Sequence, residues 1–157
     1  MNPNNNSVYL SREKLEDLKK ELEFLKSTKR KEIAENLEFA KSLGDISENA
    51  EYSQAREDQA KTEDRILQIE ENLKNAVIVT KHHSSNIEVG STVIVEKGDS
   101  GVKQKYQIVG SEESDMKQGK ISNRSPLGEA LFGKKKGDKV TFKTPTGITN
   151  YKILEIE

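Results

Sequence analysis

The most constraining feature of this sequence is a pair of seven-residue apolar repeats in its N-terminal half. In each repeat, mostly apolar side chains recur at steps of three and four residues, a spacing that places them in one stripe along a helix and predicts a coiled coil. Ser11 precedes the first repeat and is suited to cap that helix. The first repeat comprises Leu15, Leu18, Leu22 and Leu25, followed at looser steps by Ile33, Leu37 and Ala40. The second comprises Ala55, Gln59, Thr62, Ile66, Ile69, Leu73 and Ala76.

The numbering of the two repeats predicts where the chain turns back. In an antiparallel hairpin, the residue numbers of facing positions add up to a constant. That constant is 91 for Leu15/Ala76, Leu18/Leu73, Leu22/Ile69 and Leu25/Ile66, and 92 for Leu37/Ala55 and Ala40/Tyr52. The reversal is therefore expected at residues 44–46, where Gly44 suits the position just after a helix end. A helix over residues 11–43 is about 50 Å long, and its Lys29 faces Thr62 in a polar layer that we expect to be a weak point.

The C-terminal half has the pattern of a small sheet. Ala76–Thr80 is expected to be a strand that leaves the second helix, and four later segments are rich in Val, Ile, Thr and Tyr and are also predicted to be strands. These segments are residues 90–97, 105–110, 139–144 and 150–157. Residues 125–133 predict a short helix that Ser125 caps, Pro126 begins and Gly133 ends. We therefore expect an α+β protein with two domains: an antiparallel coiled coil in residues 1–80, and an antiparallel β domain with one short helix in residues 81–157.

Composition excludes several classes of protein. The chain has no Cys, which rules out a disulfide framework and a Cys-based zinc site. Its two His residues, His82 and His83, are neighbours that we assign to a solvated linker. No apolar run approaches a membrane span, and the polar start of the chain lacks the features of a signal peptide and is expected to fray. A cytosolic protein is expected. Residues 1–80 carry a net charge of −4 and residues 81–157 one of +3, which is too mild to indicate nucleic-acid binding.

The predicted turn carries two acids, Asp45 and Glu48, and their spacing allows two interpretations. The pair fits a capping box, or Ser47 could cap the second helix with Glu48 in its first turn; both account for the acids without a function. Alternatively, two carboxylates three residues apart could share a Mg²⁺ ion. Because Mg²⁺ needs six oxygen ligands, such a site would be weak unless a partner completed it. Lys41 and Arg56 lie near enough along the chain to contact a phosphate backbone, or are ordinary surface charges.

Three segments resemble the bacterial GreA/GreB transcript cleavage factors, and the GreA branch more than the GreB branch. The segment GDISENAEYSQAREDQ (44–59) is similar to the tip of that family's coiled coil. The segment YLSREKLEDLKKELEFL (9–25) is similar to its first helix, and GKISNRSPLGEALFGKKKGDKV (119–140) to its C-terminal signature. The resemblance extends over nearly the whole chain.

The resemblance implies a fold and a function. The family has an N-terminal antiparallel coiled coil and a C-terminal FKBP-like domain. The globular domain docks at the secondary channel of bacterial RNA polymerase, and the coiled coil reaches the catalytic centre. There, two acids help to hold a second Mg²⁺ while the polymerase cleaves backtracked RNA near its 3′ end. The factor is thus a cofactor protein and not an enzyme alone, and we expect a monomer.

By position, the resemblance assigns roles to six residues. Asp45 and Glu48 match the family's metal-binding, catalytic tip acids. Lys41 and Arg56 match basic positions that contact the extruded RNA. The polymerase-docking loop matches the region around Ser125 and Pro126.

Three other functions stay open. A Gre-like protein could enter the channel as a regulator or inhibitor without promoting cleavage, although the presence of both acids argues against this. An FKBP-like domain could be a prolyl isomerase, but that activity needs an aromatic-lined pocket, and residues 81–157 contain only two Phe and two Tyr. A plain coiled-coil adaptor would need no fixed chemistry at the turn.

Overall fold

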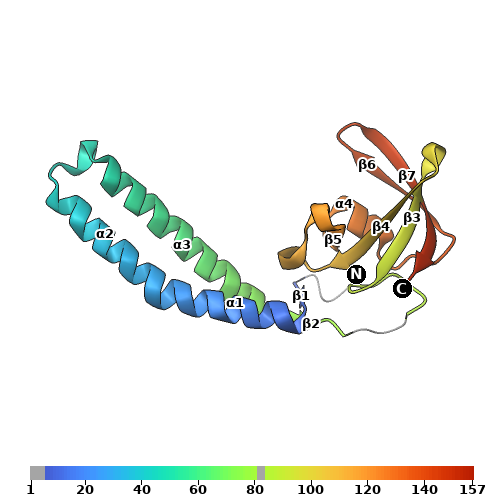
Figure 1. The fold of residues 1–157 in the computed structure, drawn as a ribbon, viewed down its shortest axis with the longest axis horizontal. Coiled ribbons are helices and arrows are strands. Elements are labelled where there is room, and N and C mark those ends of the chain that lie inside the picture. Colours follow the sequence, from blue (N-terminus) through green and yellow to red (C-terminus); the bar gives the residue numbers. More distant parts are fainter. Residues whose placement is uncertain (1–5, 81–83) are drawn as a thin grey trace. The chain divides into compact units, whose positions relative to one another are not determined.

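The computed structural model describes residues 6–80 and 84–157, and these residues pack into two units (Figure 1). The hairpin unit spans Leu15–Asn75, and the sheet unit combines the chain up to Lys14 with Ala76–Glu157. The expected α+β class is confirmed, with a helical hairpin followed by a sheet that carries a short helix. The domain boundary between residues 80 and 81 stays a prediction. The predicted His82–His83 linker and the start of the chain lie outside the described residues.

The hairpin unit is built from three helices. Helix α1 (Arg12–Phe24) continues through a π-helical segment (Leu25–Lys29) into α2 (Arg30–Ser42), and α3 (Ala50–Lys74) returns alongside α2 (Figure 1). Ser11 caps α1 as expected, because its Oγ accepts a hydrogen bond from the Lys14 N–H at 3.1 Å. The buried side chains of the hairpin all belong to the predicted repeats: Leu18, Ile33, Ala40, Ala55, Thr62, Ile66 and Ile69.

The π-helical segment explains why the sum of facing residue numbers changes from 91 to 92. In this segment the Arg30 N–H donates to the carbonyl of Leu25, five residues back, where an α-helix would use the fourth. A π turn accommodates one extra residue in a helix. Between Leu25 and Ile33, the first arm of the hairpin therefore contains one residue more than the part of the second arm that faces it. Lys29, one member of the expected polar layer, ends this irregular segment, and Thr62, the other member, is buried.

Ion pairs link the two arms of the hairpin along its exposed sides. The Arg30 guanidinium forms two hydrogen bonds of 2.8 Å with the Glu63 carboxylate. Arg65 makes a similar pair with Glu21, at 2.8 and 3.0 Å, and Lys26 pairs with Glu70. Because these groups are substantially exposed, each pair contributes little by itself; the buried seam supplies most of the stability.

The sheet unit contains a two-stranded and a five-stranded sheet. Strands β1 (Val8–Leu10) and β2 (Ala76–Ile78) are parallel. The larger sheet has the order β5-β4-β3-β7-β6. Its strands are β3 (Thr92–Lys97), β4 (Val102–Val109), β5 (Lys120–Ser122), β6 (Lys139–Thr144) and β7 (Gly147–Ile156). The expected antiparallel pairing holds for β4-β3-β7-β6, but the sheet is mixed because the unforeseen strand β5 runs parallel to β4.

Helix α4 (Pro126–Leu131) closes the core of the sheet unit. As expected, Ser125 caps it, and Gly133 follows it with a positive φ of 76°. Gly128 packs so tightly that a Cβ there would lie 2.0 Å from the Ser122 carbonyl oxygen. The core comprises Ile87, Val93, Val95, Ile108, Ile121, Leu127, Leu131, Val140, Tyr151 and Ile153.

Strand β1 is held against the rest of the sheet unit by two contacts, one at Tyr9 within the strand and one at Ser11, just before α1. The Ser11 N–H and Oγ both donate to the carboxylate of Glu113, at 3.0 and 2.6 Å. A Cβ on Gly110 would lie 1.8 Å from the Tyr9 carbonyl oxygen, so only glycine allows the backbones to approach so closely. This packing, which the sequence did not predict, joins the residues before α1 to the C-terminal half of the chain.

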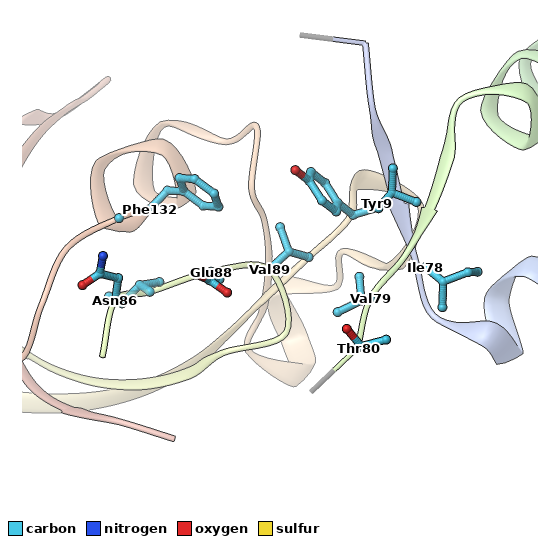
Figure 2. A pocket seen from close by; sticks show the side chains of 11 residues that line it. Tyr9, Ile78, Val79, Thr80, Asn86, Glu88, Val89 and Phe132 are labelled. Carbon is cyan, nitrogen blue, oxygen red and sulfur yellow. The ribbon is translucent and has the colours of Figure 1, made fainter. Parts of the chain in front are cut away.

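The sheet unit also carries a pocket of about 400 Å³ (Figure 2). Tyr9 from β1 and Phe132 from the end of α4 are its aromatic residues, and most of the remaining lining is aliphatic, including Val79 and Val89. Two aromatic rings fall short of the aromatic-lined pocket that the prolyl isomerase alternative needs. Among the described residues, no helix combines the length and the apolar character that crossing a membrane would require.

Candidate functional site at the hairpin tip

The chain reverses direction at the predicted place. Helix α2 ends at Ser42, a single 3₁₀ turn covers Ile46–Glu48, and α3 begins at Ala50. Gly44 has a φ of +125°, a conformation that side-chain-bearing residues rarely adopt. The two predicted acids therefore lie at the tip of the hairpin, in the few residues between its arms.

Asp45 is held in place by the local backbone. Its Oδ1 accepts a hydrogen bond from the Ser47 N–H at 3.0 Å and so caps the 3₁₀ turn. This hydrogen bond lowers the pKa of the Asp45 carboxyl below its ordinary value, because it stabilises the charged form. Asp45 is exposed. The tip thus presents a carboxylate that is anionic at neutral pH and restricted in orientation, and its outward side faces solvent.

Glu48 ends the same turn and has a different environment. It is exposed, and within the described chain its carboxylate forms no hydrogen bond or ion pair. The two acids are thus complementary, one fixed by the backbone and the other free to reach a ligand.

Asn49, which the sequence analysis overlooked, organises the tip. Its Oδ1 accepts from the Tyr52 N–H at 3.1 Å and caps α3, while its Nδ2 donates to the Ala40 carbonyl at 2.6 Å. Neither capping interpretation of the acids holds for α3: Asp45 caps only the 3₁₀ turn, and Ser47 does not cap α3. Asn is among the preferred capping residues, and its place directly before the helix was the available signal.

The two predicted cations lie on either side of the tip. Lys41 is in the last turn of α2, exposed and without an ion pair in the described residues. Arg56 is in the second turn of α3, where its Nη1 donates to Gln59 Oε1 at 2.7 Å. Both side chains remain accessible to an anionic ligand.

The tip has the right chemistry for Mg²⁺ but too few ligands to hold it alone. No group of three or more His, Cys, Asp or Glu residues is placed to bind a metal among the described residues. Asp45 and Glu48 provide the carboxylate oxygens that Mg²⁺ prefers, and two such ligands suffice when the remaining positions come from water or another molecule. The tip therefore fits a shared metal site and not a self-contained one.

Ser125 and Pro126, the predicted docking residues, are in the sheet unit. The Ser125 hydroxyl donates to the Ser122 carbonyl at 2.7 Å and accepts from the Gly128 N–H at 3.1 Å, so it is committed to the start of α4. Pro126 is exposed. Of the two, Pro126 offers the freer contact surface.

Comparison with known proteins identifies the family of this chain. Residues 8–78 match the family model "Transcription elongation factor, N-terminal", and residues 82–157 match "Transcription elongation factor, GreA/GreB, C-term". Transcription elongation factor GreA of Clostridium acetobutylicum is 49% identical over 89% of this chain and 90% of its own length. The GreA protein of Clostridium perfringens is 48% identical over 95% and 94%. The crystal structure of GreA factor homolog 1 of Thermus thermophilus is 29% identical, covers 96% of this chain and 99% of its own, and has a TM-score of 0.43. On the strength of the sequence matches, this chain belongs to the GreA/GreB family of transcription elongation factors.

Proposed function

We propose that this chain binds bacterial RNA polymerase through the secondary channel and stimulates the polymerase's own cleavage of backtracked RNA, which rescues arrested complexes. The observation that carries the proposal is the exposed pair of acids at the hairpin tip, Asp45 and Glu48, in a chain of this family. The polymerase supplies the rest of the active site, so the chain acts as a cofactor protein and does not catalyse the reaction alone. It acts as a monomer in the cytoplasm, where its partner is found.

The two acids divide the work of binding a shared Mg²⁺ ion. When bound, that ion activates and orients the water that attacks the RNA phosphodiester. Asp45 offers a carboxylate whose orientation is set by the Ser47 N–H. Glu48 has no competing partner in the described chain and can adjust to the ion or to a water on it. Gly44 and Asn49 fix the turn that presents both acids.

Two further contacts complete the proposed complex. Lys41 and Arg56 bind phosphates of the extruded RNA near its 3′ end, since both cations are exposed beside the tip. The start of α4 contacts the polymerase through Pro126, with Ser125 fixing the shape of that surface from inside.

Substitution of the tip acids tests the proposal. Asp45→Asn removes the charge but keeps an oxygen that can accept the Ser47 N–H. Glu48→Gln likewise removes the charge and keeps the size of the side chain. We expect each to lower the rate of stimulated RNA cleavage on a backtracked complex by at least about tenfold, as is usual for the loss of a group that supports a catalytic metal. Polymerase binding, measured by competition with labelled wild-type protein, should change little.

A matched control is Glu51→Gln, which alters an exposed acid in the first turn of α3 and should cleave as wild type does. Wild-type cleavage rates in both tip variants would refute the assigned role. A wild-type protein that binds the polymerase without shortening the RNA would instead identify a channel-binding regulator or inhibitor.

A further inference from the structure

Apolar side chains are exposed beside the acids at the hairpin tip. Phe39, in the last turn of α2, is 61% exposed, and Leu43, the residue that follows the helix end, is 54% exposed; Ile46 in the 3₁₀ turn is 48% exposed. Phe39 and Leu43 are four residues apart and so lie on one face of the helix end. The predicted seam continues through Leu37 and Ala40, so neither residue helps to join the two arms. We call Phe39 and Leu43 the apolar tip pair.

Exposure of this pair is not required by the fold. Exposed apolar side chains scattered singly are ordinary, but adjacent large ones indicate a contact surface. Here an aromatic and an aliphatic side chain lie together at the end of an arm that is rich in charged residues. Their exposure loses the free energy that burial would provide, and within the hairpin unit no structural role offsets this loss.

The charges around the pair select the kind of partner. From residue 35 to residue 51 the chain carries one cation, Lys41, and five acids: Glu35, Glu38, Asp45, Glu48 and Glu51. Along α2 no cation shares the face of Phe39 and Leu43, where Glu35 lies four residues before Phe39, so a phosphate backbone is not favoured on that face. Lys41 is two residues from Phe39 and so does not share its face. The complementary partner is therefore a protein surface that is apolar at its centre and basic around it.

We propose that the apolar tip pair docks on such a protein surface of RNA polymerase and holds the tip in place, an inference that rests on the proposed function. Phe39 and Leu43 are positioning residues: they touch neither the metal nor the RNA, and they raise the occupancy of the tip without changing the chemistry. Asp45 and Glu48 then act from a tip that is anchored on one side.

The experiment measures cleavage of backtracked RNA against factor concentration. We expect the double variant Phe39→Ala/Leu43→Ala to raise the concentration for half-maximal cleavage by about tenfold, while the rate at saturation stays that of wild type. Leu67→Ala is the matched control, because Leu67 is 64% exposed on α3 and distant from the tip in sequence. Phe39→Leu, which keeps an apolar side chain, should retain most of the affinity.

Competition with labelled wild-type protein for polymerase without nucleic acid completes the test. A weaker double variant here confirms a protein partner. If the double variant bound more weakly only to complexes that hold backtracked RNA, the pair would contact RNA and the inference would be wrong. It would also be overturned by an unchanged half-maximal concentration, or by a lower saturating rate alone. Failure of the wild type to stimulate cleavage would reject the proposed function, while the binding competition would still decide the docking.

Discussion

The hairpin unit and the sheet unit are stabilised in different ways. The hairpin buries a single line of side chains from each arm, and its remaining surface is exposed and mostly polar or charged. The sheet unit gathers ten buried side chains from its strands, α4 and the segment before β3 into one core. Close backbone approaches at Gly110 and Gly128 tighten that unit further.

Because of this difference, the residues that stabilise the fold and the residues proposed to act in cleavage lie in different parts of the chain. Along the hairpin, residues outside the seam are free to vary, so the tip can present acids, cations and apolar side chains without disturbing the fold. In the sheet unit, most positions that matter for folding contact residues distant in sequence. We therefore expect substitutions in the sheet unit to affect folding, and substitutions at the tip to affect function.

The largest effect that would test this contrast is expected at Gly110. Gly110→Ala places a Cβ 1.8 Å from the Tyr9 carbonyl oxygen, and relief of this clash requires β1 to move. We expect a loss of about 3 kcal/mol in the free energy of unfolding of the sheet unit. Urea unfolding followed by tyrosine fluorescence measures it, because three of the four Tyr residues belong to that unit.

Gly133→Ala is the control in the same unit. A Cβ there meets open space, and the cost of a positive φ alone is about 1 to 2 kcal/mol. Equal losses in the two variants would show that close packing at Gly110 is not what holds β1. A hairpin that lost helical circular dichroism together with the tyrosine signal would show that the two units unfold together.

Two single-residue deletions test whether the π turn adjusts the register of the two arms of the hairpin. Deleting Thr28 removes the extra residue of the π-helical segment and leaves all facing pairs with the same sum, so the change in unfolding free energy should stay within about 1 kcal/mol. Deleting Asp64 from α3 increases the offset between the arms and displaces Ile66 and Ile69 from the seam. That deletion should cost about 2 kcal/mol.

Thermal unfolding followed by circular dichroism compares the two deletions. Both side chains are exposed and form no hydrogen bond or ion pair in the described chain, so the comparison isolates the register of the two arms. If the Thr28 deletion destabilised the hairpin as much as the Asp64 deletion, the π turn would not be the adjustment between the two repeats.

The smallest effect is expected from the ion pair between Arg30 and Glu63. Its hydrogen bonds lower the pKa of the Glu63 carboxyl and raise that of Arg30. A lowered folded-state pKa contributes stability above the unfolded value of 4.5, and this is lost as the pH falls through the folded pKa. Glu63→Gln should therefore be slightly less stable than wild type at neutral pH and equal to it in acid.

Thermal unfolding at several pH values and salt concentrations measures the difference. Because the pair is exposed, salt should also reduce it. Glu38→Gln, which changes an exposed acid without a partner in the described chain, should show no such pH dependence. A difference that persisted in acid would mean that Glu63 stabilises the hairpin by packing and not by charge.

The sequence by itself determined the hairpin, because a coiled coil is specified by local spacing. The heptad steps identified the buried seam, and the facing sums located the turn at Gly44 and Asp45, so the places of the tip acids and cations followed. The main strands and α4 were also predictable, since alternation and the Ser125-Pro126 start are local signals. The roles of Asp45, Glu48, Lys41, Arg56, Ser125 and Pro126 stay predictions from family resemblance.

Only the tertiary structure decided the features that depend on distant contacts. Strands β1 and β5 have three residues each, too few to show a period, and they exist because β2 and β4 provide hydrogen-bonding partners. The sum of facing residue numbers changed by one along the hairpin, but only the folded structure showed that a π turn holds the extra residue. Asn49 organises the tip because α2 brings the Ala40 carbonyl within reach of its amide, a contact across nine residues that no local pattern encodes.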